Sequence, residues 1–280
     1  MTVILDGRET ASRVVEELKA KAGGLKAKGV TPTLALILVG GDEASLRYVN
    51  MKAKRCEEVG VNPQFHHLEH ASQEQLLDLI ESLNCDPSIH GIMVQLPLPK
   101  EFDELTAVAA ISPEKDVDGL NPSTLGMLLM GEECFVPAGV EAIIELLRRY
   151  GIDPEHRHWV VVGLSNIVGK PMAALLANMK ATVTCVQATN PDFAEYTRGA
   201  DVLVVDVSRK WAITSDMVKK GAVVFDNGNN YEGKKVYGDV DFDAVKEAAS
   251  AITPVPGGIG PLLITMLIRN TLRAAERKCT

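Results

Sequence analysis

The alternation of strand-like and helix-like segments is the feature that most limits the fold of this chain. Helix-length segments separate the strand-like ones, and the first of them carries apolar residues at helical spacing from Ala11 to Leu25. Strands that alternate with helices predict an α/β fold with mostly parallel sheets. Short apolar runs with the length of buried strands occur at 34–39, 89–96, 159–163, 182–186, 202–207 and 222–226.

Four chemically useful side chains lie in the first half of the chain. Tyr48 and Lys52 are four residues apart, so in a helix they project from one face. Gln95 closes an apolar strand, because prolines soon follow it, and Asp118 lies in the polar string Lys115-Asp-Val-Asp118-Gly119. Ligands of open parallel sheets bind at the carboxyl ends of strands. An α/β fold could therefore bring a phenol, an amine, an amide and a carboxylate to one cleft.

Each of these residues also has a purely structural explanation. Tyr48 and Lys52 could lie on a partly exposed helix face, where a lysine is usually solvated. Gln95 could satisfy a loop carbonyl at the end of its strand. Asp118 and the glycine after it could form a turn before Pro122. Spacing alone does not decide between these readings and a binding site.

A glycine-containing loop in the second half is a candidate phosphate site. The strand at 159–162 runs into Gly163-Leu-Ser-Asn-Ile-Val-Gly169-Lys-Pro171. Glycine after a strand lets the backbone turn tightly and approach a pyrophosphate, and Pro171 suits the first turn of a following helix. Ser165 stands where a GxGxxG fingerprint has its middle glycine, so this signal is weak by itself and a plain structural connection is the alternative.

These strings, in this order, resemble the methylenetetrahydrofolate dehydrogenase/cyclohydrolase family over essentially the whole chain. The family string A-S-x-x-Y-V-x-x-K-x-K matches from Ala44 to Lys54, and the loop G-x-S-x-x-V-G-x-P matches at every fixed position from Gly163 to Pro171. Further matches are V-Q-L-P-L-P around Gln95, D-V-D-G at Asp118, and the run Pro254-Val-Pro-Gly-Gly-Ile-Gly260.

The resemblance implies a role for each matched residue. Oxidation of methylenetetrahydrofolate and hydrolysis of methenyltetrahydrofolate are the implied activities, with Lys52, Tyr48, Gln95 and Asp118 as the catalytic residues. The implied contacts with the folate substrate are Tyr48, Gln95, Asp118, Pro256, Gly257 and Gly258. The implied contacts with the nucleotide cofactor are Gly163, Leu164, Ser165, Ile167, Val168, Gly169 and Asn229.

The resemblance also implies two domains. Residues 1–120 and 260–280 are expected to form an α/β folate-binding catalytic domain, with the carboxyl-terminal helix packing back on it. Residues 121–259 are expected to form a Rossmann-type nucleotide-binding domain. A homodimer is expected from the same resemblance.

The nucleotide half departs from the family at positions that bear on cofactor choice. NADP-using members often carry arginine where this chain has Leu164, and a C-H-S-x-T string where this chain reads Val186-Gln-Ala-Thr-Asn190. The family G-x-P turn is replaced by Ser208-Arg-Lys210. A 2′-phosphate needs cationic or hydroxyl partners, and Arg209, Lys210 or Lys170 could supply the charge. NADP is therefore the expected cofactor, with NAD also accepted.

Composition excludes several other classes of function. A formal net charge of −8 argues against a nucleic-acid partner, and the longest apolar run is too short to span a membrane. The amino terminus has no signal-peptide core. Five scattered cysteines without a CxxC pair argue against a zinc or disulfide framework, so no metal is expected and the expected compartment is the reducing cytoplasm.

Two alternative functions stay open at this level. The altered nucleotide-side residues would suit a cyclohydrolase or folate-binding paralogue that has lost the hydride step. A generic two-domain NAD(P) dehydrogenase of another small substrate, with Lys52 as the catalytic acid, is the third possibility.

Overall fold

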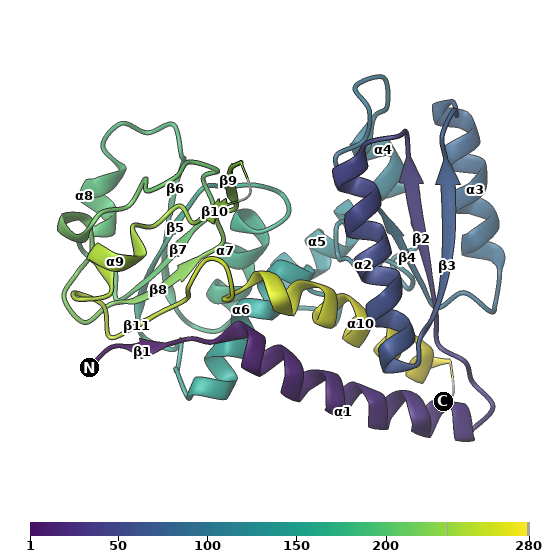
Figure 1. The fold of residues 1–280 in the computed structure, drawn as a ribbon, viewed down its shortest axis with the longest axis horizontal. Coiled ribbons are helices and arrows are strands. Elements are labelled where there is room, and N and C mark those ends of the chain that lie inside the picture. Colours follow the sequence, from purple (N-terminus) through teal and green to yellow (C-terminus); the bar gives the residue numbers. More distant parts are fainter. Residues whose placement is uncertain (234, 279–280) are drawn as a thin grey trace. The chain divides into compact units, whose positions relative to one another are not determined.

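The chain folds into two compact units (Figure 1), seen here in a computed structural model that describes residues 1–233 and 235–278. Unit 1 comprises residues 1–11 and 139–263, and unit 2 comprises residues 12–138 and 264–280. The helices that carry the boundaries are α1 (Gly7–Ala27), α6 (Ala138–Tyr150) and α10 (Gly260–Arg277). Both units combine helices with parallel sheets, so the predicted α/β class is confirmed.

Unit 2 is built on a short parallel sheet with strand order β3-β2-β4. The central strand β2 is buried along its whole length, which explains its continuous apolar run. Val94 ends β4, and Gln95 therefore directly follows the carboxyl end of that strand. The elements of this unit besides parts of α1 and α10 are β2 (Thr33–Val39), α2 (Glu43–Val59), β3 (Asn62–Leu68), α3 (Gln73–Cys85), β4 (Gly91–Val94), α4 (Glu104–Ala109) and α5 (Pro122–Met130).

Unit 1 contains the sheet expected of a Rossmann-type domain, with strand order β1-β11-β8-β7-β5-β6 and every neighbouring pair parallel. Its core is rich in valine, as parallel strands covered on both faces favour. Its elements are β1 (Val3–Ile4), α6, β5 (His158–Val162), α7 (Gly169–Asn178), β6 (Thr182–Val186), α8 (Phe193–Thr197), β7 (Val202–Val205), the 3₁₀ helix η1 (Ser215–Met217), β8 (Val223–Asp226), β9 (Asn230–Glu232), β10 (Lys235–Tyr237), α9 (Phe242–Val245) and β11 (Ala251–Ile252).

The two units differ from the predicted domains mainly in two segments, residues 1–11 and residues 121–138. Residues 1–11 belong to unit 1, because β1 pairs with β11 and Leu5, which follows β1, is fully buried. Residues 121–138 belong to unit 2, where the amide of Asn121 donates to the carbonyl oxygens of Ala109 and Ile111 at 3.1 and 2.7 Å. The expected packing of the last helix is confirmed, since Ile264–Arg277 of α10 belongs to unit 2.

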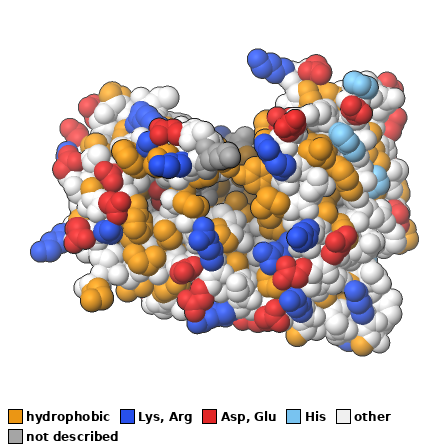
Figure 2. Space-filling view, viewed as in Figure 1, with side chains coloured by type: hydrophobic (Ala, Val, Ile, Leu, Met, Phe, Trp, Pro, Cys, Tyr) orange, Lys and Arg blue, Asp and Glu red, His pale blue; other side chains and the backbone are white. Residues whose placement is uncertain are grey.

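Acidic and basic side chains lie side by side among the described residues on the face that Figure 2 shows. In residues 1–233 and 235–278, no helix is both long and apolar enough to cross a membrane.

Candidate active site

Helix α2 places Tyr48 and Lys52 one turn apart in unit 2. The helix begins at Asp42, whose carboxylate accepts the N–H of Ser45 at 2.7 Å, and it ends at a left-handed glycine. Its face against β2 and β3 carries the fully buried Val49 and Cys56. Tyr48 keeps 40% of its surface exposed.

Gln95 is a close hydrogen-bond partner of Lys52. The ammonium Nζ of Lys52 donates to Oε1 of Gln95 at 2.8 Å. The other end of the amide is occupied, because its Nε2 donates to the carbonyl oxygen of Leu96 at 2.6 Å. The backbone N–H of Gln95 donates to the carbonyl oxygen of Ile37 at 2.8 Å, which ties the residue to the central strand. The amide therefore has one fixed orientation, with its oxygen toward the lysine.

Asp118 completes a charged pair with Lys52. Burial lowers the pKa of Lys52, and the negative charge of Asp118 opposes that effect. Burial raises the pKa of Asp118, and the positive charge of Lys52 opposes it. The amine is thus easier to deprotonate, and the carboxylate easier to protonate, than in water. The structure brings Lys52, Gln95 and Asp118 together, with Tyr48 one turn from the lysine.

The loop that carries Asp118 is held by two buried residues just before it. Nζ of Lys115 donates to the carbonyl oxygens of Leu83, Asn84 and Asp86 at 2.7 Å each, and so binds the end of α3. The carboxylate of Asp116 accepts the backbone N–H groups of Leu120 and Asn121 at 3.1 and 2.9 Å. Burial raises the pKa of Asp116 to about 6.

Helix α10 fixes the same loop from its other side. The amide of Asn270, which is fully buried, donates to the carbonyl oxygens of Val117 and Val136 at 3.0 and 3.2 Å. Gly119 has a φ of +71°, and a Cβ there would lie 2.7 Å from the backbone nitrogen of Pro137. Sequence reasoning missed Lys115, Asp116 and Asn270 as supports, although the charged Lys115-Asp-Val-Asp118 string carried a signal for the first two.

In unit 1, the loop between β5 and α7 has the close approaches of a phosphate-binding turn. Gly163 has a φ of +91°, and a Cβ on it would lie 1.8 Å from the carbonyl oxygen of Asp206. A Cβ on Gly169, the first residue of α7, would lie 1.9 Å from the carbonyl oxygen of Gly163. Only glycine fits at either position, and the amino terminus of α7 follows directly. This loop fits the pyrophosphate of a dinucleotide, because such a ligand needs close backbone approach and a helix amino terminus.

Ser165 holds this loop to the end of β7. Its hydroxyl donates to the carboxylate of Asp206 at 2.9 Å and accepts the backbone N–H of Val168 at 3.1 Å. The other oxygen of Asp206 accepts the amide N–H of Asn227 at 3.1 Å, and burial raises the pKa of this carboxyl group. Sequence reasoning missed Asp206; its position after an apolar strand was the signal available.

The remaining predicted contact residues lie in unit 1, whereas the four proposed catalytic residues lie in unit 2. Val168 is buried and Ile167 is exposed, so the two face different surroundings within one loop. Leu164 is half-buried, and the amide of Asn229 donates to the hydroxyl of Tyr231 at 3.0 Å.

The glycine-rich turn before α10 is packed tightly against the start of α1. Pro256 is exposed, whereas Gly257 and Gly258 are buried. The backbone N–H of Gly7 donates to the carbonyl oxygen of Gly257 at 2.9 Å, and a Cβ on Gly7 would lie 1.6 Å from the oxygen of Gly258. Tight packing within unit 1 therefore explains this run of glycines, and their predicted contact with substrate stays a prediction.

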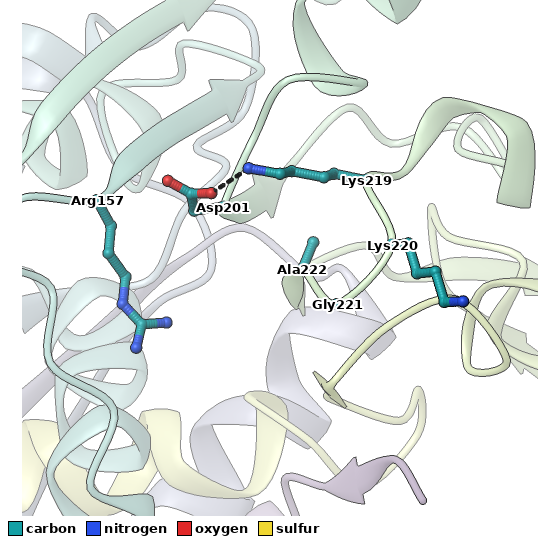
Figure 3. A pocket seen from close by; sticks show the side chains of 6 residues that line it. All are labelled: Arg157, Asp201, Lys219, Lys220, Gly221 and Ala222. Atoms are coloured by element: carbon teal, nitrogen blue, oxygen red, sulfur yellow. Dashed lines mark hydrogen bonds and ion pairs between the residues drawn. The ribbon is translucent and has the colours of Figure 1, made fainter.

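A cavity of about 220 Å³ lies at the amino ends of strands in the unit 1 sheet (Figure 3). Its lining residues come before strands: Asp201 precedes β7 and Ala222 precedes β8. Figure 3 shows Lys219 directed at Asp201, and the two form an ion pair at 2.6 Å. Since nucleotides bind outside the carboxyl ends of parallel strands, this cavity is separate from the candidate nucleotide site.

Comparison with known families gives two matches that together cover most of the chain. Residues 5–118 match the catalytic domain of tetrahydrofolate dehydrogenase/cyclohydrolase. Residues 137–279 match the NAD(P)-binding domain of tetrahydrofolate dehydrogenase/cyclohydrolase.

Individual proteins are similar over the full length. The bifunctional protein FolD of Moorella thermoacetica is 49% identical, over 98% of this chain and 99% of that protein. The structure of the Campylobacter jejuni bifunctional enzyme FolD superposes with a TM-score of 0.97 at 44% identity, over 99% of this chain and 100% of the other. The Trypanosoma brucei FolD structure, a complex with NADP cofactor and inhibitor, superposes with a TM-score of 0.94 at 36% identity, over 99% and 98% of the two chains.

Proposed function

The chain belongs to the tetrahydrofolate dehydrogenase/cyclohydrolase family, and we propose that it catalyses both reactions in that name. The first oxidises methylenetetrahydrofolate to methenyltetrahydrofolate with a nicotinamide cofactor. The second hydrolyses methenyltetrahydrofolate to formyltetrahydrofolate. The observation that carries the proposal is the 2.8 Å hydrogen bond between Lys52 and Gln95 beside the carboxylate of Asp118.

Asp118 and Tyr48 bind and orient the folate. The aminopyrimidinone edge of the pterin presents adjacent N–H donors, and a carboxylate accepts two such donors at once. Lys115, Asp116 and Asn270 hold the loop of Asp118, so this acceptor is preorganised. The half-exposed ring of Tyr48 stacks on or positions the bound substrate.

Lys52 moves protons in the hydrolysis. The nitrogen lone pairs of the substrate stabilise the methenyl cation, and a permanently charged lysine beside that cation would oppose its formation. Burial lowers the pKa of Lys52, so the neutral amine is accessible. The neutral amine assists the attack of water on the methenyl carbon and then returns a proton during ring opening. Gln95 holds the amine in position throughout.

The loop from Gly163 to Gly169 and the amino terminus of α7 hold the pyrophosphate of the cofactor, and Ser165 fixes the loop. A nicotinamide cofactor held there would supply the acceptor for the hydride that the methylene group releases. NADP is a usable cofactor for this chain, and NAD is also accepted, because Leu164 and Ala188 remove two usual partners of a 2′-phosphate.

We also propose that the chain works as a homodimer in the cytoplasm. The four cysteines in the described part of the chain, Cys56, Cys85, Cys134 and Cys185, are free thiols, which suits a reducing compartment. Cys279 lies outside the described residues. The dimer rests on the family resemblance, and sedimentation at micromolar concentration tests it, with a monomer contradicting it.

The test of the function is an assay of both activities on the folded protein. Reduction of the nicotinamide cofactor with methylenetetrahydrofolate measures the dehydrogenase, and decay of methenyltetrahydrofolate absorbance measures the cyclohydrolase. We expect both. Hydrolysis without cofactor reduction would instead indicate a paralogue that has lost the hydride step, and oxidation of hydroxy acids without folate binding would indicate a different dehydrogenase.

A further inference from the structure

Three cations near the nucleotide loop of unit 1 are candidates to meet the charge of a 2′-phosphate, and their surroundings separate them. Nζ of Lys170 donates to the side-chain oxygen of Asn166 at 2.7 Å. Nζ of Lys210 forms an ion pair with Glu232 at 2.6 Å. It also lies 3.7 Å from the ring centroid of Tyr237 and 4.4 Å from that of Trp211. Lys210 is therefore neutralised and enclosed by aromatic rings.

Arg209 differs from both lysines. Within residues 1–233 and 235–278, its guanidinium pairs with no carboxylate. Its one described side-chain contact is with Phe193, whose ring centroid lies 5.5 Å from the guanidinium carbon. A guanidinium above an aromatic face keeps its N–H edges available for other acceptors. Arg209 is thus an exposed cation that is positioned but not neutralised.

The contact with Phe193 places Arg209 near the end of β6. Arg209 comes from the loop after β7, whereas Phe193 begins α8, shortly after β6. In the sheet, β5 lies between these two strands, and the candidate pyrophosphate loop follows β5. In dinucleotide-binding folds, the segment after the second strand of the nucleotide unit meets the adenosine ribose, and an arginine nearby accommodates a 2′-phosphate.

A buried carboxylate fixes the backbone of this arginine. Asp239, which is fully buried, accepts the backbone N–H groups of Val207, Ser208 and Arg209 at 2.6, 3.1 and 2.9 Å. Consecutive N–H groups of this kind bind anions, and here an internal anion already occupies them. The backbone N–H groups of residues 207–209 therefore have no capacity left for phosphate, and the charge that this loop can still offer lies on the side chain of Arg209.

We propose that Arg209 binds the adenosine 2′-phosphate of NADP and gives this chain its preference for NADP over NAD. The inference rests on the proposed dehydrogenase function and names the residue that sets its cofactor selectivity. The planar guanidinium donates two parallel N–H bonds to phosphate oxygens while its face stays on Phe193. One cation from a different loop thus replaces the two phosphate-binding residues that the family has at the positions of Leu164 and Ala188.

The first test compares Arg209→Gln with Lys170→Gln, which removes one positive charge from another exposed position of unit 1. We expect Arg209→Gln to lower kcat/KM for NADP by roughly 10- to 150-fold, the change that corresponds to the loss of one charge-assisted contact of about 1.5–3 kcal/mol. We expect kcat/KM for NAD to stay within about twofold, and Lys170→Gln to leave the ratio of the two cofactors unchanged. Equal losses for both cofactors, or an altered ratio only in Lys170→Gln, would overturn the assignment.

The second test is calorimetric and needs no folate. Adenosine 2′,5′-bisphosphate and adenosine 5′-phosphate are titrated into the wild-type protein and Arg209→Gln. The wild type should bind the bisphosphate more tightly, and the variant should lose that difference. Equal binding of the two by the wild type contradicts the inference. A lost preference in the variant, together with no folate turnover by the wild type, would support Arg209 and reject the proposed function instead.

Discussion

Replacement of Gln95 by leucine should make Lys52 easier to deprotonate. The variant loses the oxygen that accepts the 2.8 Å hydrogen bond from Nζ. A hydrogen bond to a charged group contributes about 1.5–3 kcal/mol, and one between neutral groups about 0.5–1.5 kcal/mol. The charged amine therefore loses about 1–1.5 kcal/mol more than the neutral one. Since one pKa unit corresponds to about 1.36 kcal/mol, the pKa of Lys52 should fall by about one unit below its already lowered value.

The direction in which Gln95→Leu shifts the pH dependence of the rate depends on which protonation state of Lys52 reacts. In the proposed mechanism the neutral amine assists water, so cyclohydrolase kcat should rise with pH through the pKa of Lys52 and then level off. In Gln95→Leu the midpoint of that rise should move to lower pH by about one unit. Gln95→Glu keeps the shape but puts a carboxylate beside the ammonium, so its midpoint should move to higher pH.

The assay is the decay of methenyltetrahydrofolate absorbance at saturating substrate, corrected for the spontaneous reaction at each pH. Lys52→Arg is the control for assignment, because arginine stays protonated throughout and should show no such rise. A midpoint that stays in place in both Gln95 variants, or that moves in the same direction in both, would refute the coupling of Gln95 to Lys52.

Three further predictions concern single positions. Lys52→Met should lower cyclohydrolase activity by roughly two to four powers of ten while dehydrogenase activity falls less, with Arg55→Met on the same helix as control; equal retention of both activities would remove Lys52 from the mechanism. Gly163→Ala should weaken nucleotide binding at least about tenfold in calorimetry, because the added Cβ would lie 1.8 Å from the carbonyl oxygen of Asp206, and it should leave methenyl hydrolysis intact. Undiminished nucleotide affinity would show that the loop is not the pyrophosphate site. Asn270→Ala should lower the free energy of unfolding in urea by about 1–3 kcal/mol, because two carbonyl groups near Asp118 lose their donor; an unchanged value would mean that water replaces the amide.

Local patterns were sufficient to predict much of the fold and the positions of several candidate site residues. The apolar run at 34–39 is buried from end to end as β2, and the four-residue spacing of Tyr48 and Lys52 is realised in α2. The proline residues after Gln95 correctly placed it at the end of a strand. In each of these cases, the information lies within one turn of helix or one strand.

Interactions between distant parts of the sequence were not predictable in the same way. Asp239 binds the loop at 207–209 from about thirty residues away, and Asp206 meets Ser165 across 41 residues. Strand β3 was missed because its residues are half-exposed and alternate poorly, although it pairs with β2 over its whole length. The sequence alone did not show which of Arg209, Lys210 and Lys170 is available to bind a phosphate. That choice needs the partners of each cation, such as Glu232, which pairs with Lys210.

The pairing of β1 with β11 has a consequence for the order of events on the ribosome. Val3 and Ile4 are synthesised long before their partners, Ala251 and Ile252, which emerge nearly 250 residues later. Unit 2 has a similar interruption, because its first segment ends at residue 138 and its last begins at residue 264. Unit 1 therefore cannot complete its fold before residue 263 has emerged, and unit 2 cannot do so before α10 has emerged, although single domains commonly fold in sequence during translation. During synthesis, the apolar surface of unit 2 stays unfinished until α10 has left the exit tunnel.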